Sequence, residues 1–485
     1  MPYIIAPHLL QLLIRGGVVA YVVLIVVLVV NVLGEKRNPR STLAWVMALI
    51  LFPVGGALIY FFLGRSLRNV KMISRRNRRK LINSKPRAPL PKLDLEFSAE
   101  NRQLVRLAGS VADAELYTGN AVEIFNNGTA LFERFFADLR EAREYINLQF
   151  YIIACDALGR RLHDILCQKA REGVKVRVIY DYVGSFGSKS REFFRSMRRA
   201  GVDAHAFFRI EFPNKLSLIN WRNHRKVAVI DGRLGYIGGF NIADRYLGGG
   251  KFDIWRDLMV RVEGPAVAGL QSNFAIDWKF MGHPLLTDHI STAPVECSGD
   301  AIPDVRAQLV ASGPTSRWAG SLFMYFKAIS GAKRRAWIQT PYFLPSDDLL
   351  KALQSAALSG VDVRVMVPLT SDSAVLAYAS DSFVEECLLA GIKVFKCKPG
   401  MLHAKLLIID DDYVSLGSTN FDYRSFDHNF EENIVMYSHT VNSRLAELYK
   451  ADERNCTRLR LSTWNKRRRR KKALEALSRL LSPVL

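Results

Sequence analysis

The stretch NHRKVAVIDG, residues 223–232, sets a histidine and a lysine one residue apart in front of an apolar run. Side chains on a β-strand alternate between its two faces, so we expect His224 and Lys226 to project from the same face of a strand. Asp231 has the opposite parity and is expected to point away from them. An imidazole and an ammonium group are therefore predicted to stand side by side at the edge of a buried strand.

The pattern occurs a second time in HAKLLIID, residues 403–410. In both copies a glycine follows the aspartate by seven residues, and an asparagine follows the histidine by 17 residues (241 − 224 and 420 − 403). One His-x-Lys pair is more often a surface pair than a catalyst, but two copies with equal offsets indicate a duplicated site. The residues of this site motif are His224, Lys226, Asp231 and Asn241 in the first copy and His403, Lys405, Asp410 and Asn420 in the second.

Each copy of the motif follows a longer repeat. Residues 146–181 and residues 337–368 both read as strand, loop, helix, glycine and strand, and a further helix-like segment follows each of them. Units of this βαβα kind favour a parallel or mixed sheet that is flanked by helices. The sequence therefore predicts an α/β fold that contains two similar halves.

Two apolar segments without charged residues lie near the start of the chain, Val18–Leu33 and Leu43–Leu63. The second segment is long enough to cross a bilayer, the first is long enough if Gly16 and Gly17 are counted, and together they predict a transmembrane hairpin. Pro53 and the two glycines that follow it are expected to kink the second segment or to make it re-entrant. Residues 65–92 then carry eleven basic residues and no acid, which predicts that the chain continues on the cytoplasmic side.

The whole chain is strongly basic, with 68 lysines and arginines against 46 acids and a formal net charge of +22. This charge favours a polyanionic partner, either nucleic acid or anionic lipid. The apolar segments favour lipid, because a nuclease gains little from a membrane hairpin, and no nucleic-acid partner is expected. KRRRRKK at 466–472 precedes leucines at helical spacing, which predicts a basic amphipathic helix on an anionic membrane surface, with a solvated tail or nucleic-acid arm as the alternative.

The cysteines and histidines form no recognisable metal-binding pattern. The six cysteines show no CxxC pair and no regular spacing, so we expect isolated reduced thiols in a cytosolic domain. The sequence predicts no metal and no cofactor.

Two sets of His, Lys and Asn suit the transfer of a phosphate group. The lysines and asparagines, with Ser418 as a further candidate, offer donors to the non-bridging oxygens of a phosphate. One imidazole attacks phosphorus and the other protonates the leaving oxygen, while the lysines supply the charge compensation. Each histidine needs a carboxylate to orient it, and Asp257 and Glu431 are the candidates. Asp231 and Asp410 complete the catalytic motif and are expected to be structural.

The paired motifs, written HxK(x)4D(x)6G, resemble those of the phospholipase D superfamily, and within it the chain is similar to the bacterial cardiolipin synthases over nearly its whole length. RNPRSTLAWVMALILFPVGGALIYFFLG resembles their amino-terminal membrane region, and INWRNHRKVAVIDGRLGYIGGFNIADRY resembles their first motif. TPYFLPSDDLL resembles the segment that opens their second half, and GSTNFDYRSFDHNFEEN resembles their second motif.

This resemblance implies two phospholipase D-like βα sandwich lobes, related by pseudo-twofold symmetry, that face each other across one active site. It also implies a ping-pong reaction through a phosphohistidine. One phosphatidylglycerol gives its phosphatidyl group to a histidine and releases glycerol, and a second phosphatidylglycerol accepts the group to form cardiolipin. The family's pattern makes His224 the nucleophile and His403 the general acid and then base, although the near-symmetric repeats leave the reverse order open.

The expected organisation has four parts: a transmembrane hairpin at 1–64, a basic juxtamembrane linker at 65–105, a first lobe at 106–295, and a second lobe at 296–485 that ends in the basic amphipathic tail. The protein is expected in the bacterial inner membrane, multi-pass, with cytoplasmic lobes. The alternatives are a membrane-bound hydrolase of the phospholipase D type, a transphosphatidylase with another acceptor alcohol, and a silent lipid-binding scaffold. RIEFPNKLSLIN, residues 209–220, is predicted to be a lid at the lipid entrance or an ordinary surface loop.

Overall fold

The computed structural model describes residues 7–35, 39–64, 67, 70–83, 97–210, 218, 220–248, 252, 254–291, 295, 299–398 and 400–483. The chain divides into two compact units. The small unit joins Met1–Asn69 to Ile210–Asn220, and the large unit joins Val70–Arg209 to Trp221–Leu485. Both copies of the site motif lie in the large unit. Most of the predicted lid, residues 211–217 and 219, lies outside the described residues.

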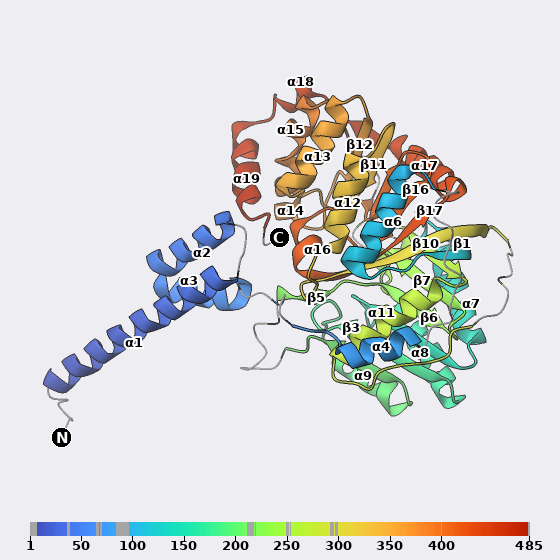
Figure 1. The fold of residues 1–485 in the computed structure, drawn as a ribbon, viewed down its shortest axis with the longest axis horizontal. Coiled ribbons are helices and arrows are strands. Elements are labelled where there is room, and N and C mark those ends of the chain that lie inside the picture. The colour runs from blue at the N-terminus through green and yellow to red at the C-terminus, as the bar shows by residue number, and fades with distance from the viewer. Residues whose placement is uncertain are drawn as a thin grey trace. The chain divides into compact units, whose positions relative to one another are not determined.

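One sheet runs through the large unit, and its main strands form two matching sets (Figure 1). The first set comprises β1 (Tyr117–Phe125), β2 (Tyr145–Phe150), β3 (Lys175–Asp181), β4 (Asp203–Phe207), β6 (Val227–Ile230), β7 (Leu234–Gly238) and β9 (Met259–Glu263). The second comprises β10 (Ile302–Ser312), β11 (Arg335–Gln339), β12 (Asp362–Pro368), β13 (Lys393–Cys397), β15 (Leu406–Ile409), β16 (Tyr413–Gly417) and β17 (Asn429–Tyr437). The order β4-β3-β2-β6-β7-β9-β1 in the first set matches β13-β12-β11-β15-β16-β17-β10 in the second, and the sets meet where β1 pairs with β10.

The matching strand order gives the large unit its pseudo-twofold symmetry and confirms the predicted α/β class with two similar lobes. In the first set β2, β3 and β4 pair in parallel, in the second β11, β12 and β13 do, and the other strands of each set pair antiparallel. The predicted repeats form β2–α8–β3 and β11–α13–β12, with α8 at Ala157–Arg171 and α13 at Asp347–Leu358. Both helices begin at a capping side chain, because Asp156 accepts the N–H of Gly159 and Ser346 accepts the N–H of Leu349.

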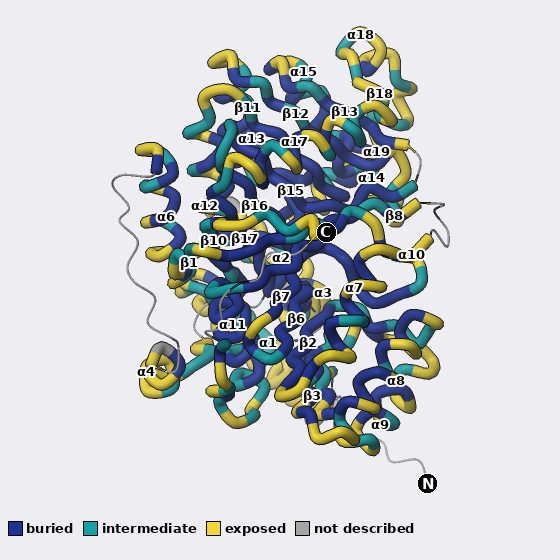
Figure 2. The backbone as a smooth tube through the Cα atoms, turned by 90° about the vertical axis from the view of Figure 1, so that its right-hand side faces the viewer, coloured by how far each residue is buried: buried dark blue, intermediate teal, exposed yellow. Residues whose placement is uncertain are grey.

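Helices cover both faces of the sheet, and the strands between them are largely buried (Figure 2). On one face α7 (Gly128–Glu141) and α8 pack on the first lobe, and α12 (Gly320–Ser330) and α13 pack on the second. On the other face α11 (Val267–Phe280) and α17 (His439–Glu453) share a single apolar cluster with strands of both lobes. This shared core fixes the two lobes against each other, and the site motifs lie at their junction.

The basic stretch predicted as a linker contains α4 (Arg75–Asn83), whose Leu81 is buried in a cluster with Ile179 and Phe207. Residues 84–96 lie outside the described part of the chain. The next helix, α6 (Ala99–Ala112), packs on α12 of the second lobe, so the predicted boundary at 105/106 falls inside a helix. Part of the stretch between the small unit and the lobes is thus packed onto the large unit.

The small unit begins with α1 (Pro7–Gly34). Within the described residues, its stretch Leu10–Gly34 is the one helix that is long and apolar enough to cross a bilayer. The second predicted segment is not one helix but α2 (Pro39–Leu51), α3 (Pro53–Ile59) and the π-helical turn η1 (Tyr60–Gly64). The break falls at Phe52, because Pro53 cannot donate the backbone hydrogen bond that would continue α2. A Cβ on Gly56 would lie 2.3 Å from Ala48 O, so the glycine lets α3 fold back closely onto α2.

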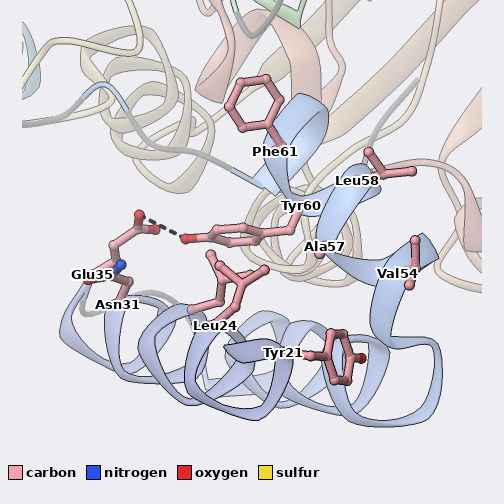
Figure 3. Close-up of a pocket in the computed structure, with 10 residues that line it drawn as sticks. Tyr21, Leu24, Asn31, Glu35, Val54, Ala57, Leu58, Tyr60 and Phe61 are labelled. Atoms are coloured by element: carbon pink, nitrogen blue, oxygen red, sulfur yellow. Dashed lines mark hydrogen bonds between the residues drawn. The ribbon is translucent and has the colours of Figure 1, made fainter. Parts of the chain in front are cut away.

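A groove of ≈ 740 Å³ lies between α1, α3 and η1 (Figure 3). Its wall is mainly apolar, and Tyr60 Oη donates a hydrogen bond to Glu35 Oε1 at 3.3 Å at one end. Many apolar side chains of α1 are exposed. An exposed apolar helix of this length is typical of a segment that lies in lipid.

The cysteines differ from the expected set of isolated thiols. Cys397 on β13 and Cys456 on β18 (Cys456–Arg458) form a disulfide across the antiparallel pair that these strands make. The two cysteines are 59 residues apart, and only the tertiary pairing of β18 with β13 brings them together. Cys155, Cys167 and Cys387 are free thiols, and Cys297 lies outside the described residues.

Candidate active site

Two short parallel strand pairs carry the site motifs across the boundary between the lobes. β5 (Arg222–Asn223) pairs with the start of β17, and β14 (Met401–Leu402) pairs with β8 (Trp255–Arg256). The pairing continues into the histidines, because the His224 N–H donates to Phe430 O at 2.9 Å and the His403 N–H donates to Arg256 O at 2.7 Å. Each histidine therefore lies beside a strand of the other lobe.

The His-x-Lys residues lie between strands and not within one, which corrects the placement predicted from parity. The reason is that the chain leaves the cross-lobe pair at the histidine and joins its own sheet only after the lysine. The lysines still turn toward the histidines. Lys226 Nζ donates to His224 O at 2.6 Å, and Lys405 Nζ donates to His403 O in the same way.

The first half-site is His224 with Glu431, which comes from the second lobe. His224 Nδ1 lies 3.0 Å from each carboxylate oxygen of Glu431, and Ser418 Oγ donates to Glu431 Oε2 at 2.5 Å. Burial lowers the pKa of His224, and the negative charge of Glu431 only partly opposes this shift. The ring is therefore neutral at pH 7, with its Nδ1–H donated to the carboxylate and its Nε2 free to act as a nucleophile or base.

The second half-site is His403 with Asp257, which comes from the first lobe. His403 Nδ1 lies 2.6 Å from Asp257 Oδ2, and Lys405 Nζ lies 2.6 Å from His403 Nδ1 and 3.9 Å from Asp257 Oδ2. Burial, assisted by the charge of Lys405, lowers the pKa of His403. Gly239 occupies the position that Ser418 has in the other half-site, and a Cβ there would lie 2.0 Å from Asp257 Oδ1. The absence of a side chain at Gly239 lets the carboxylate approach His403.

Electrostatic coupling joins the two half-sites. Lys405 lowers the pKa of His224, and Lys226 lowers the pKa of His403, although burial is the larger cause for both histidines. Burial also lowers the pKa of Lys226 well below its ordinary value and that of Lys405 to about 8. The paired carboxylates keep these buried cations from being isolated charges.

Asp231 and Asp410, grouped with the catalytic residues by the motif, lie outside these contacts. Each sits at positive φ at the end of a strand, where its carboxylate accepts a row of three consecutive backbone N–H groups. The donors are Arg143, Glu144 and Tyr145 for Asp231, and Lys333, Arg334 and Arg335 for Asp410. The two aspartates tie β6 to β2 and β15 to β11, which is the structural role that their parity predicted.

The three residues predicted as phosphate ligands differ in the hydrogen bonds that their side chains already make. Asn241 uses both ends of its amide, since Oδ1 accepts the Ile152 N–H at 3.0 Å and Nδ2 donates to Tyr246 Oη at 2.6 Å. Asn420 has a buried Oδ1 with no hydrogen-bond partner among the described residues, and because this oxygen only accepts hydrogen bonds, a phosphate oxygen has to be bound through Nδ2. Ser418, predicted as a phosphate ligand, instead donates its hydroxyl to Glu431 behind His224 and therefore positions the carboxylate.

Aromatic rings line the two histidines. The Tyr151 ring centre lies 5.0 Å from that of His224, and the Trp255 and Tyr246 ring centres lie 5.1 and 6.3 Å from that of His403. Sequence reasoning gave Tyr151 and Tyr246 no specific role. Their positions in the sequence could have identified them. Tyr151 directly follows β2, and Tyr246 comes five residues after the motif asparagine Asn241.

Arg225, between the motif histidine and lysine, was also missed. Its Nη1 donates to Asp277 Oδ2 at 2.6 Å in the first lobe, and its Nε donates to Glu431 O at 3.2 Å in the second. The residue is buried, so this ion pair is desolvated and costly to break. Arg225 thereby fixes the strand that presents Glu431 to His224.

The described residues contain no group of three or more His, Cys, Asp or Glu side chains arranged to hold a metal ion. The site has two buried imidazoles, each oriented through Nδ1 by a carboxylate, and two lysines that act on both. Such a pair of imidazoles suits in-line displacement at a phosphate, one as nucleophile and one as acid and base, with the lysines stabilising the charge on phosphate oxygens.

Comparisons with known proteins agree with this geometry. The profile of the family described as "Cardiolipin synthase, PLD-like domain" matches residues 135–278 and 325–452, and that described as "Phospholipase_D-nuclease N-terminal" matches residues 20–65. The chain is similar to the cardiolipin synthase of Geobacillus kaustophilus, at 37% identity over 96% of this chain and 92% of that one. It is also similar to the major cardiolipin synthase ClsA of Bacillus subtilis, at 36% identity over 96% and 98%. Among solved structures, the phosphatidylserine synthase of Haemophilus influenzae shares the fold, with a TM-score of 0.60, 14% identity, and coverage of 79% of this chain and 100% of that one.

Proposed function

Because the chain belongs to the cardiolipin synthase family of phospholipase D-like phosphatidyltransferases, we propose that it joins two phosphatidylglycerol molecules into cardiolipin and releases glycerol. The observation that carries the proposal is the crossed pairing of His224 with Glu431 and of His403 with Asp257. It gives one site two oriented imidazoles, which a double displacement through a covalent intermediate needs.

In the first step His224 Nε2 attacks the phosphorus of the donor lipid, and the bond from phosphorus to the glycerol headgroup oxygen breaks. His403 gives its proton to that oxygen, so glycerol leaves neutral. Burial by itself favours the neutral form of His403, because it lowers the pKa of the ring. The negative phosphate of the bound lipid raises the pKa of His403 in the complex, because an anion nearby favours the charged imidazolium.

In the second step the now neutral His403 takes the proton of the headgroup hydroxyl of a second phosphatidylglycerol. The oxygen attacks phosphorus, the bond between phosphorus and His224 Nε2 breaks, and cardiolipin forms. Lys226, Lys405 and the amide of Asn420 stabilise the phosphate oxygens in both steps. Glu431 and Asp257 hold the reacting rings through Nδ1 and stabilise the cationic state of each ring.

The test is product analysis with the purified full chain in detergent and phosphatidylglycerol, radiolabelled in the headgroup, as the sole lipid. We expect cardiolipin and free glycerol in equal amounts. Phosphatidic acid in place of cardiolipin would mean that water is the acceptor and that the protein is a hydrolase. A transferase of another specificity would release glycerol only after a different alcohol is added.

We further propose that α1 anchors the protein in the bacterial inner membrane and that the large unit is cytoplasmic. The predicted hairpin would place the basic loop with Lys36, Arg37 and Arg40 on the opposite side from the eleven basic residues of 65–92. The fold-back of α3 onto α2 favours a single crossing by α1 and a re-entrant second segment, which leaves both basic clusters on the cytoplasmic side. Labelling of a cysteine placed at the amino terminus in intact cells distinguishes the two: a single crossing exposes it, and a hairpin does not.

The carboxy-terminal helix supports the proposed contact with an anionic membrane surface. α19 (Arg469–Leu480) turns its polar residues Glu475 and Ser478 inward and leaves Leu477 62% and Leu480 77% exposed. Glu475 is held by two hydrogen bonds from Arg467, at 2.8 and 3.1 Å. A helix that presents leucines to the outside beside a run of cations fits the interface of an anionic bilayer.

A further inference from the structure

We propose that a pocket of the first lobe, between the loop Gly184–Ser190 and Arg245, binds the phosphate of the acceptor lipid. The inference rests on the proposed function and adds a preference to it: the site favours an acceptor alcohol that itself carries a phosphate. A phosphatidylglycerol gains from this contact, whereas water, glycerol and ethanol react without it.

The pocket has a volume of ≈ 440 Å³ and belongs entirely to the first lobe. Its walls are the chain that follows β2, the loop that follows β3, and the residues that follow the motif asparagine. Phe186 on the loop is 77% exposed, so a large apolar side chain stands at the pocket beside its polar groups. A lipid headgroup with its acyl chains needs polar and apolar surface of this kind side by side.

Two cations line the pocket, Arg245 and Lys189. Both are exposed, and neither has a salt bridge to a carboxylate among the described residues. The acid that lines the pocket, Asp156, is already occupied, because its Oδ1 accepts the Gly159 N–H at 3.0 Å and its Oδ2 accepts the Asp244 N–H at 2.7 Å. Lys189 and the part of the Arg245 guanidinium that does not hydrogen-bond the Tyr246 hydroxyl are therefore available to a phosphate.

Between the pocket and each histidine stand aromatic residues whose rings contact that histidine. Arg245 lies over the rings of Trp255 and Tyr246, at 5.3 and 5.5 Å from their centres, and these are the rings that contact His403. On the other side Ser185 Oγ donates to Tyr151 O at 3.2 Å, and the Tyr151 ring contacts His224. A phosphate on Arg245 thus leaves the glycerol of the same lipid to reach toward the reacting phosphorus between the histidines.

The second lobe has an arginine at the place of Arg245. Ile242 corresponds to Phe421, since the bridges Phe343 to Phe421 and Ile153 to Ile242 are equivalent, so Arg424 corresponds to Arg245, and it is only partly exposed where Arg245 is exposed. The Tyr342 hydroxyl donates to Asp372 at 2.8 Å, and the strand pairings make Asp372 the counterpart of Ser185. The pocket of the first lobe also contains a carboxylate, Asp156, so the preference for the first lobe rests on the exposed pair Arg245 and Lys189.

The experiment compares two reactions of one covalent intermediate in the full-length protein reconstituted in phosphatidylglycerol vesicles. Cardiolipin formation uses an acceptor with a phosphate, and exchange of radiolabelled free glycerol into phosphatidylglycerol uses an acceptor without one. For Arg245→Ala, Lys189→Ala and the double variant we expect cardiolipin formation to fall, by about tenfold or more in the double variant through a higher KM. Glycerol exchange should change by less than about twofold in the same samples. Arg444→Ala, which removes an exposed arginine from α17, is the matched control.

A parallel fall of both reactions would show that Arg245 and Lys189 act on the shared step, and it would overturn the acceptor site. Cardiolipin formation at the wild-type rate in the double variant would overturn it as well. In either case a wild-type protein that makes cardiolipin keeps the proposed function intact. A wild-type protein that exchanges glycerol but makes no cardiolipin would overturn the proposed function and the acceptor site together.

Discussion

The two half-sites share a histidine and a lysine but differ in what stands behind the imidazole. His224 is held by Glu431, which a serine hydroxyl supports, whereas His403 is held by the shorter Asp257, which a glycine allows to approach. Lys405 reaches the ring nitrogen of its own histidine, whereas Lys226 contacts the backbone oxygen of His224. The repeat has thus kept the positions and changed the chemistry, which favours one nucleophile and one acid over two interchangeable histidines.

The largest effect is expected from the histidines themselves. His224→Ala and His403→Ala should each lower cardiolipin formation by at least about 10⁴-fold, because each removes one of two groups that act together. A donor lipid with a nitrophenol headgroup separates them, since nitrophenolate leaves without a proton. With this donor His403→Ala should still release nitrophenol in a burst, and His224→Ala should not.

His439→Ala is the control for these variants, because His439 is exposed on α17. A burst in His224→Ala that is absent in His403→Ala would reverse the assignment of nucleophile and acid. A burst of full size in both variants would contradict the scheme with a single histidine nucleophile.

The next largest effect should come from replacing the two carboxylates. It tests whether each histidine depends on the carboxylate of the other lobe. Glu431→Gln and Asp257→Asn keep the shape of each side chain but lose the charge that orients and stabilises the ring, so we expect rates to fall by roughly 10²- to 10³-fold. With the nitrophenol donor the two should diverge: Glu431→Gln slows attack by His224, and Asp257→Asn leaves it largely unchanged. If Asp257→Asn slowed the burst and Glu431→Gln did not, His224 would depend on the carboxylate of its own lobe and not on the one that it contacts.

Smaller effects are expected from changes at Gly239 and Ser418, the residues beside the two carboxylates. Gly239→Ala places a Cβ 2.0 Å from Asp257 Oδ1, and the displaced carboxylate should cost about 10²-fold in kcat. Ser418→Ala removes one hydrogen bond to Glu431 and should cost only about three- to tenfold. Thermal unfolding of both variants checks that the folds are intact. Equal losses in the two would show that the half-sites tolerate change alike.

The smallest effect concerns pH. Lys405 is a cation below its pKa, which burial lowers to about 8, and it loses its charge as the pH rises through that value. The value of kcat/KM, which reports the free enzyme, should therefore decrease above pH 8 and be lower by about tenfold at pH 9. A decrease in kcat/KM that begins only near pH 10 would mean that Lys405 titrates like an ordinary lysine. Circular dichroism across the range excludes unfolding as the cause.

Much of the fold followed from local sequence. The repeats at 146–181 and 337–368 and the paired motifs predicted two α/β lobes, and the strand order confirms them. These features were accessible because periodicity and equal offsets are properties of the chain itself. The break of the second apolar segment at Phe52 was foreseen only as a choice between a kink and a re-entrant turn, since Pro53 ends a helix but does not say where the next one packs.

The crossing of the half-sites could not be predicted from sequence. Asp257 and Glu431 were proposed as orienting residues, but which histidine each contacts depends on the pairing of β5 with β17 and of β14 with β8. These pairs are two residues long and join segments far apart in the chain. For the same reason the hydroxyl of Ser418 was expected at the phosphate and is found at Glu431.

Glu431 leaves the ribosome 207 residues after His224. At ordinary rates of protein synthesis this interval lasts roughly 10–40 s. During that time α1 can already hold the growing chain among its own substrate lipids, while the first lobe exposes a histidine without the carboxylate that orients it. The half-made enzyme is therefore chemically silent at the membrane, and its reactivity begins only when synthesis has ended and the second lobe has docked.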